Sequence, residues 1–274
     1  MEIEYHYFSW NFLSAPNLFN TQKSKSGLLF RIDKKYFLSY CPWEQFGDES
    51  LDEVLNSIRA KKKKPIWFEN QLALSKIAEN IVDRPFKNHD LNEGNSSVVK
   101  IKADSDFDLL IKKIDKSVSK GQRVRIDFNN LLNKEDFEAF EKKMPSNLID
   151  KIDYIEDPYP VEKDESYNTD ISIACDRNPR VTDIAIYKPA VDEIVETKKR
   201  IIYSSYMGHD LERYYCYIDL MLNGDLNEWH GIDTPSLYKE QKKIFLKEGD
   251  YCRVNRKEVE TLFTEMENIQ WTSI

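Results

Sequence analysis

Apolar and polar residues alternate over the first part of the chain in the manner of antiparallel strands. An aromatic-rich run from Glu2 to Trp10 is followed by two further runs, Leu28 to Ile32 and Tyr36 to Cys41. The polar segment Asp33-Lys34-Lys35 separates the last two runs. This spacing predicts a β-hairpin within an antiparallel sheet.

Two helices are expected next, because apolar residues recur there at helical spacing. Leu51 and Ile58 bound the first apolar stripe, and Leu74 and Ile81 bound the second. The lysine run 61–64 between them is expected to be a solvated helix end rather than a nucleic-acid patch, since the chain is acidic overall. The polar stretch 92–97 then predicts a domain boundary.

Short apolar runs alternate with helical stripes after this boundary, which indicates a parallel sheet or barrel. The expected strands are Val98–Lys102, Arg123–Phe128, Ile152–Glu156, Ile171–Cys175, Ala185–Tyr187 and Ile201–Ser205. Helices are expected at Phe107–Val118, around Phe137 and Phe140, and from Leu211 to Leu222. The fold class is therefore α/β.

Composition narrows the classes of function. The 274 residues include 40 Lys and Arg against 48 Asp and Glu, a formal charge of −8, so the chain has no general attraction for nucleic acid or an anionic membrane. It contains no run of about 18 apolar residues and no basic stretch followed by an apolar run at its start. We therefore expect a cytoplasmic protein that acts on a small molecule. The four cysteines are widely spaced and are expected to be reduced thiols.

Charged residues at the ends of the predicted strands carry the chemical signal. They are Lys100, Lys102, Asp127, Asn129, Glu156, Asp176 and Lys188. Each alone is more often a surface residue or a member of an ion pair, but a charged residue ends five predicted strands in succession. In an eight-stranded α/β barrel the strand ends on one face converge, so these side chains can meet at one site.

Three carboxylates on successive strands are suited to a hard divalent cation such as Mg²⁺, which prefers oxygen ligands. Lysines close to the cation and to each other should repel, so we expect the pKa of at least one to be lowered. A neutral lysine is a usable base. Removal of a proton next to a substrate carboxylate builds a second negative charge on that group, and a bound cation stabilises it.

Several short motifs surround these residues. They are Val99-Lys100-Ile101-Lys102, Arg125-Ile126-Asp127-Phe128-Asn129, Ile155-Glu156-Asp157-Pro158, Ala174-Cys175-Asp176, Tyr187-Lys188-Pro189, Gly231-Ile232-Asp233-Thr234, and Pro42-Trp43 with Phe46-Gly47-Asp48. In order and spacing they resemble the enolase superfamily and, within it, the o-succinylbenzoate synthase family. The resemblance covers most of the chain.

The resemblance implies a fold of the enolase-superfamily type, with a modified and shortened (β/α) barrel and an α+β capping domain. The barrel would span residues 97–235, and the capping domain residues 1–96 completed by about 236–274. It also implies a Mg²⁺ cofactor, with Mn²⁺ as a substitute. Oligomeric state is not predicted.

The resemblance further implies a role for each site residue. Asp127, Glu156 and Asp176 would bind the metal. Lys102 would act as general base and then general acid with support from Lys100, and Lys188 would stabilise the enolate by its charge. Asn129, Ser204 and Ser205 would bind the substrate.

The implied reaction is the syn dehydration of 2-succinyl-6-hydroxy-2,4-cyclohexadiene-1-carboxylate to o-succinylbenzoate in menaquinone biosynthesis. One alternative is an N-acylamino acid or dipeptide racemase of the same superfamily. A second alternative is a non-catalytic binding protein on the same fold. Two departures from the family pattern bear on these alternatives. Arg177 stands where an acidic residue is usual, and the 20 positions from Glu156 to Asp176 and 12 from Asp176 to Lys188 are too few for full strand-helix-strand units of about 30 residues. Loops are therefore expected to replace helices there.

Overall fold

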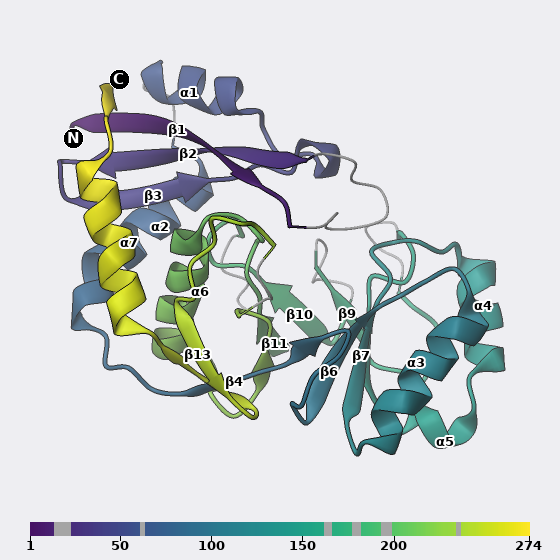
Figure 1. Cartoon of the computed structure of the whole chain (residues 1–274). Coiled ribbons are helices and arrows are strands. Elements are labelled where there is room, and N and C mark those ends of the chain that lie inside the picture. The colour runs from purple at the N-terminus through teal and green to yellow at the C-terminus, as the bar shows by residue number, and fades with distance from the viewer. Residues whose placement is uncertain (14–22, 61–63, 162–165, 177–181, 193–198, 234–236) are drawn as a thin grey trace.

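The computed structural model describes residues 1–13, 23–60, 64–161, 166–176, 182–192, 199–233 and 237–274. An antiparallel sheet at one end of the molecule has the strand order β15-β1-β2-β3 (Figure 1). Its strands are β1 (Ile3–Asn11), β2 (Ser24–Ile32), β3 (Tyr36–Tyr40) and β15 (Thr272–Ser273). The predicted hairpin is confirmed, because β2 and β3 pair antiparallel across the turn that contains Asp33 and Lys34, both with positive φ values of 50° and 56°.

Three helices pack with this sheet. They are α1 (Leu51–Arg59), α2 (Ile66–Ile77) and α7 (Arg256–Asn268). Helix α1 begins where the sequence predicts it, and a capping box between Ser50 and Glu53 stabilises its first turn. The second predicted helix, α2, begins earlier than its apolar stripe indicated, since Trp67 and Phe68 are buried against strand residues of the sheet.

A curled, parallel sheet of seven strands forms the other part of the molecule, in the order β11-β10-β9-β8-β7-β6-β5. The strands are β5 (Asp90–Leu91), β6 (Val98–Lys102), β7 (Arg123–Asp127), β8 (Ile152–Glu156), β9 (Ile173–Cys175), β10 (Ile184–Tyr187) and β11 (Arg200–Tyr203). Six of these correspond to the six predicted strands of this region. The α/β fold with a capping domain is therefore confirmed.

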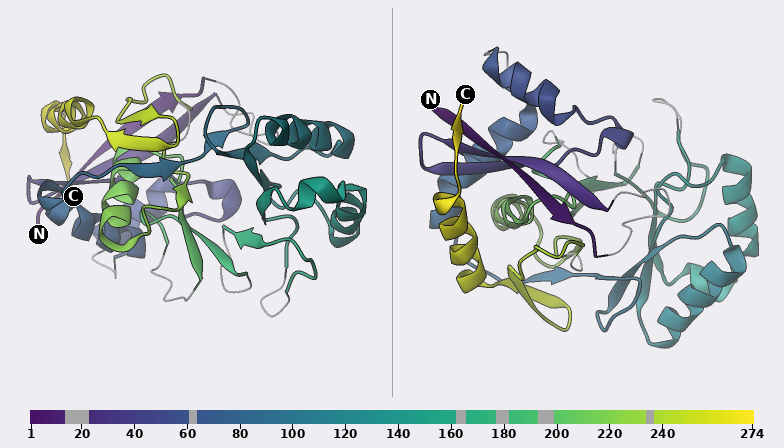
Figure 2. Two further views of the ribbon diagram at one scale, coloured as in Figure 1. Left: turned by 90° about the horizontal axis from the view of Figure 1, so that it is seen from below. Right: turned by 45° about the horizontal axis from the view of Figure 1, so that its top comes forward.

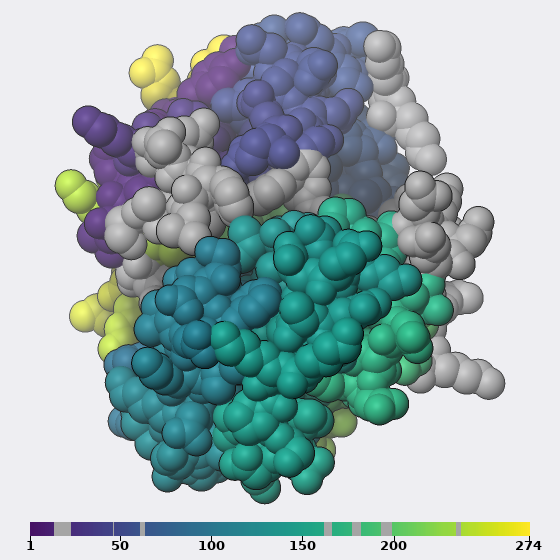
Figure 3. All heavy atoms as spheres, turned by 90° about the vertical axis from the view of Figure 1, so that its right-hand side faces the viewer, coloured from purple at the N-terminus to yellow at the C-terminus, as the bar shows by residue number. Residues whose placement is uncertain are grey.

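Helices α3 (Phe107–Ser119), α4 (Lys134–Lys143) and α5 (Ser146–Ile149) cover the first part of the sheet. Val124, Ile126 and Phe128 point toward them and join their buried cluster, as the strand alternation predicts. Figure 3 shows this face in teal, with the blue residues of the capping domain above it. Between β8 and β10 the described residues contain no helix, which agrees with the short spacing there.

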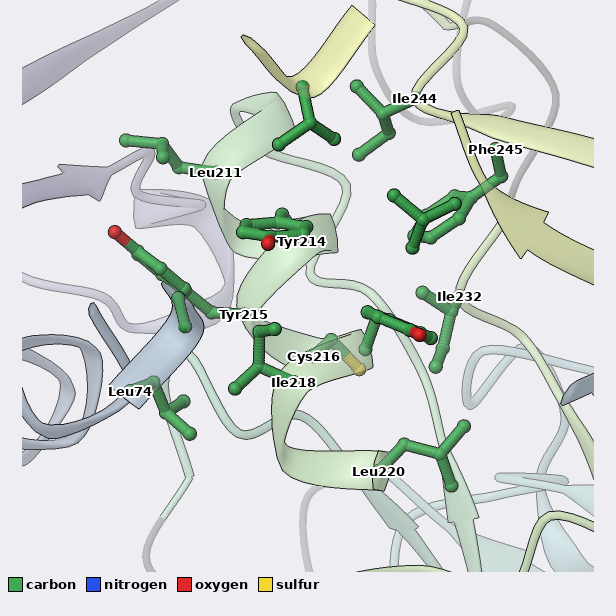
Figure 4. Close-up of a cluster of buried hydrophobic side chains, with 14 of the residues drawn as sticks. Leu74, Leu211, Tyr214, Tyr215, Cys216, Ile218, Leu220, Ile232, Ile244 and Phe245 are labelled. Atoms are coloured by element: carbon green, nitrogen blue, oxygen red, sulfur yellow. The ribbon is translucent and has the colours of Figure 1, made fainter. Parts of the chain in front are cut away.

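Helix α6 (Asp210–Asn223) follows β11 and lies between the barrel strands and the capping elements. The right-hand view of Figure 2 looks nearly along it. Figure 4 shows its side chains packing toward Leu74 of α2 on one side and toward Ile232 and Phe245 on the other. Because this buried helix packs against both parts, the capping elements and the barrel strands share one buried cluster. No helix in the described part of the chain is long and apolar enough to cross a membrane.

A second small sheet completes the barrel region and was not expected from the sequence. Its order is β12-β4-β14-β13, with β4 (Phe86–Asn88), β12 (Trp229–His230), β13 (Phe245–Glu248) and β14 (Tyr251–Val254). Ser204 forms a parallel bridge with Gly231, and the His89 N–H donates to the His230 carbonyl at 2.9 Å. Hydrogen bonds therefore continue from the end of β11 through β12 to β4, which precedes β5 in the chain.

Candidate active site

Charged side chains from neighbouring strands meet at the carboxyl end of the parallel sheet. Lys102 lies opposite Asp127 in the pairing of β6 with β7, and Asp127 lies opposite Glu156 in the pairing of β7 with β8. Lys100 is two residues before Lys102, so both lysines project to the same face of the sheet. The in-register pairing of parallel strands thus places these groups side by side.

Lysines and carboxylates of this face form ion pairs. Lys100 Nζ lies 2.8 Å from Asp127 Oδ2 and 2.8 Å from Glu156 Oε1. Lys102 Nζ also donates to Asp127 and lies 3.4 Å from Asn129 Oδ1. On the other side of the site, Lys188 at the end of β10 donates to Asp176. All six predicted metal and lysine residues are therefore brought to one face.

A compact group of carboxylates occupies the middle of this face. Glu156, Asp157 and Asp176 each offer an oxygen, and these oxygens lie within 4.8 Å of one another. Glu156 Oε2 and Asp176 Oδ1 are buried and have no hydrogen-bond partner among the described residues. Asp127, predicted as the third ligand, is not part of this group of oxygens and pairs with two lysines.

Asp157 had no role in the expectation from sequence, although it stands in the Glu156-Asp157-Pro158 motif. Strand alternation would turn its side chain away from Glu156. Its φ of 41° breaks that alternation, and its carboxylate accepts the Asp176 backbone N–H at 3.2 and 3.3 Å. The adjacency of two acids before a proline was the one signal that could have indicated it.

Burial and mutual repulsion decide the pKa values of these acids. Burial, with the Asp176 and Glu156 carboxylates, raises the pKa of Asp157 to about 8. Burial and Asp127 raise the pKa of Glu156 against the opposing effect of Lys100. Burial alone would raise the pKa of Asp127, but Lys100 and Lys102 outweigh this effect and lower it. The side of the site near Glu156, Asp157 and Asp176 thus has an excess of negative charge, and its unpaired oxygens fit a hard divalent cation.

The lowered pKa that was expected for at least one lysine is not found at Lys100 or Lys188. Burial lowers the pKa of Lys100, but Asp127 and Glu156 reverse this effect and raise it well above its ordinary value. Burial also lowers the pKa of Lys188, but Asp176 and Asp192 outweigh this effect and raise it. The physical reason is that each of these two ammonium groups directly contacts a carboxylate.

The predicted substrate-binding residues are placed differently. Asn129, with a φ of 50°, turns its side-chain oxygen toward Lys102. Ser204 and Ser205 follow β11, and neither side chain bonds the lysines or carboxylates among the described residues. Ser205 is buried and its Oγ has no hydrogen-bond partner there. Arg177 lies outside the described residues.

Comparisons with known proteins agree with this arrangement. No protein-family model matches the chain. A curated o-succinylbenzoate synthase of Bdellovibrio bacteriovorus is 26% identical over 190 residues, which span 59% of this chain and 57% of that relative. The alignment thus covers little more than half of the relative's length.

Solved structures are similar over nearly the whole chain. An o-succinylbenzoate synthase from Thermosynechococcus elongatus BP-1, with Mg in its active site, has a TM-score of 0.69 and 13% identity, and the match covers 97% of this chain and all of that one. An L-Ala-D/L-Glu epimerase has a TM-score of 0.64 and 10% identity, over 92% of this chain and 98% of that chain. The resemblance inferred from the motifs is therefore confirmed at the level of the fold, which is that of the enolase superfamily.

Proposed function

We propose that this chain, which has the enolase-superfamily fold, is a Mg²⁺-dependent o-succinylbenzoate synthase. It would dehydrate 2-succinyl-6-hydroxy-2,4-cyclohexadiene-1-carboxylate to o-succinylbenzoate in menaquinone biosynthesis. The observation that carries this proposal is the group of carboxylates flanked by Lys102 at the end of β6 and by Lys188 directly after β10. Similarity to the curated synthase supports the choice of reaction.

Glu156 and Asp176 are the residues best suited to hold the metal, since each has a buried oxygen without a partner. Asp127 remains the proposed third ligand, and Asp157 lies within the same group of oxygens. When bound, Mg²⁺ supplies positive charge to the substrate carboxylate as its α-carbon loses a proton. Lys100 holds Asp127 and Glu156 in place through its two ion pairs.

The two lysines divide the proton transfer and the charge stabilisation. The neutral amine of Lys102 takes the α-proton, and the electron pair of the broken C–H bond moves into the substrate carboxylate to give an enolate. Lys102 then gives the proton to the leaving hydroxyl, the C–O bond breaks, and the electron pair of the enolate forms the C=C bond that makes the ring aromatic as water departs. Lys188 keeps its proton and stabilises the enolate by charge.

A racemase is the second candidate, favoured by one specific observation. Lys102 and Lys188 stand on opposite sides of the carboxylates, as a reaction with one base on each face requires. An epimerase is also among the structures of similar fold. The two candidates differ in whether Lys188 exchanges protons.

The test measures product formation and proton exchange in the same variants. Wild type, Lys102→Ala, Lys188→Ala and the surface control Lys116→Ala are given the cyclohexadiene with Mg²⁺, and the absorbance of the aromatic product is followed. For a synthase both site variants are slower by about 10²- to 10⁴-fold, and the control is unchanged. Only Lys102→Ala should also lose exchange of the α-proton with solvent deuterium.

Both enantiomers of an N-succinylamino acid are offered to the same proteins. A racemase would give mirror-image variants, each retaining exchange with one enantiomer. A much higher kcat/KM for the amino acid than for the cyclohexadiene would show that the synthase assignment is wrong. Absence of turnover and of exchange with all compounds would favour the non-catalytic binding protein.

A further inference from the structure

A short segment of the capping domain, residues 42–48 (the capping segment), and the loop after β11 exchange hydrogen bonds next to the site. Asp48 accepts both the Trp43 backbone N–H at 2.6 Å and the Tyr206 hydroxyl. The Trp43 indole N–H in turn donates to the Tyr206 carbonyl at 3.1 Å. Three residues from two distant parts of the chain are thus held by reciprocal bonds.

The Tyr206 ring lies close to the lysine that the proposed function uses for charge stabilisation. Lys188 Nζ is 5.5 Å from the ring centroid, within the range of a cation–π contact. The Lys188 ammonium also donates to Asp176. Tyr206 therefore contacts Lys188 on one side while the capping segment holds its hydroxyl on the other.

Neighbouring contacts make both partners of this link rigid. Lys25 donates to the Pro42 carbonyl and stands 3.6 Å from the centroid of the Trp43 ring. On the barrel side, the Tyr238 hydroxyl donates to the Met207 carbonyl at 2.6 Å, and Met207 has a left-handed φ of 58°. A strained residue fixed by its surroundings is characteristic of a functional loop.

We propose that Tyr206 is a positioning residue for Lys188, and that Asp48 anchors it from the capping domain. This inference rests on the proposed function, because it gives Lys188 a place in the reaction. The π face of the ring attracts the ammonium and restricts where Nζ lies, while Asp48 and Trp43 fix the ring. Seating of the capping segment is thereby coupled to the position of Lys188.

The test is a double-mutant cycle with Lys188. Tyr206→Leu removes the ring, and we expect kcat to fall by about 3- to 30-fold, the size of a buried cation–π contact. In the Lys188→Ala background the same change should cost less than about twofold. Tyr206→Phe and Asp48→Ala should give intermediate losses, since both keep the ring and lose its hydrogen bond to Asp48. Equal losses in both backgrounds would overturn the proposal and assign Tyr206 a merely structural role.

Tyr217→Phe is the matched control. It removes a hydroxyl that donates to Asp83 at 3.1 Å, a bond of the same type on α6 that does not involve Lys188. We expect its kcat to change by less than about twofold and its Tm to fall about as much as that of Tyr206→Phe.

A second measurement does not depend on activity. Acetic anhydride labelling of Lys188, followed by mass spectrometry, should be at least about threefold faster in Tyr206→Leu than in wild type and unchanged in Tyr217→Phe. If wild type turns over neither compound, the proposed function fails and this rate alone decides whether Tyr206 positions Lys188. An unchanged labelling rate in Tyr206→Leu would refute the positioning role.

Discussion

Glu212 on α6 is a buried carboxyl group that we expect to control how stability depends on pH. Glu212 is 1% exposed, and its Oε2 has no hydrogen-bond partner among the described residues. Its other oxygen is 3.5 Å from Ser39 Oγ. Burial raises the pKa of Glu212 to about 8, against the weaker opposing effects of Lys25 and Ser39.

The sign follows from proton uptake on folding. Between its ordinary pKa of 4.5 and about 8, folded Glu212 holds a proton that the unfolded chain has released. Stability from this group is therefore complete below about pH 4.5 and falls as pH rises, by at most about 1.4 kcal/mol per pH unit. From pH 5 to 7.5 the loss is roughly 2 to 3 kcal/mol. Glu212→Gln keeps the shape without the ionisation and should remove this slope.

Urea denaturation at several pH values between 5 and 7.5 measures the effect. The difference between variant and wild type is the informative quantity, because His209, whose pKa burial lowers to about 3, contributes a slope of opposite sign. Lys25, with a pKa that burial lowers to about 8, contributes only above this window. Glu212→Gln should gain about 2 kcal/mol relative to wild type by pH 7.5, and the exposed control Glu260→Gln should not. Parallel pH profiles for wild type and Glu212→Gln would refute the reasoning.

Three further predictions concern the metal site and the buried ion pair between Arg125 and Asp153. Glu156→Gln should weaken Mg²⁺ binding by about 10- to 100-fold in calorimetry while circular dichroism stays unchanged, since one anionic ligand is lost at constant size; loss of folding would instead make Glu156 structural. Excess chelator should abolish dehydration, and Mg²⁺ or Mn²⁺ should restore it; full turnover in chelator would contradict the metal site. Asp153→Ala should lower the free energy of unfolding by about 3 to 5 kcal/mol in urea titrations, because buried Arg125 loses its carboxylate partner at 2.8 Å and keeps only Glu228 at 3.0 Å among the described acids; a change under about 1 kcal/mol would contradict this.

Local pattern was sufficient for the barrel strands and insufficient for the strands that depend on distant partners. Strand β6 was predicted at its observed bounds because five consecutive residues carry the signal. Strand β12, Trp229–His230, is two residues long and exists because it pairs with β4 at Lys87 and Asn88, far away in sequence. No periodicity can be read from two residues. Helix α7 was not predicted either, although its pattern is local: Val259, Leu262 and Met266 form a helical stripe that can be read from the sequence.

The candidate site shows the same division between residue type and distance. The predicted lysines and carboxylates lie together because the in-register pairing of parallel strands brings their ends to one face. The raised pKa of Lys100 was not predicted, since it depends on contacts of 2.8 Å that residue spacing does not encode. Lys100 touches two carboxylates, so its charged form is stabilised although it is buried. A base in this site must therefore be released from its carboxylate, and Lys102, which is more exposed than Lys100 and pairs with Asp127 alone among the described acids, is better placed for that exchange.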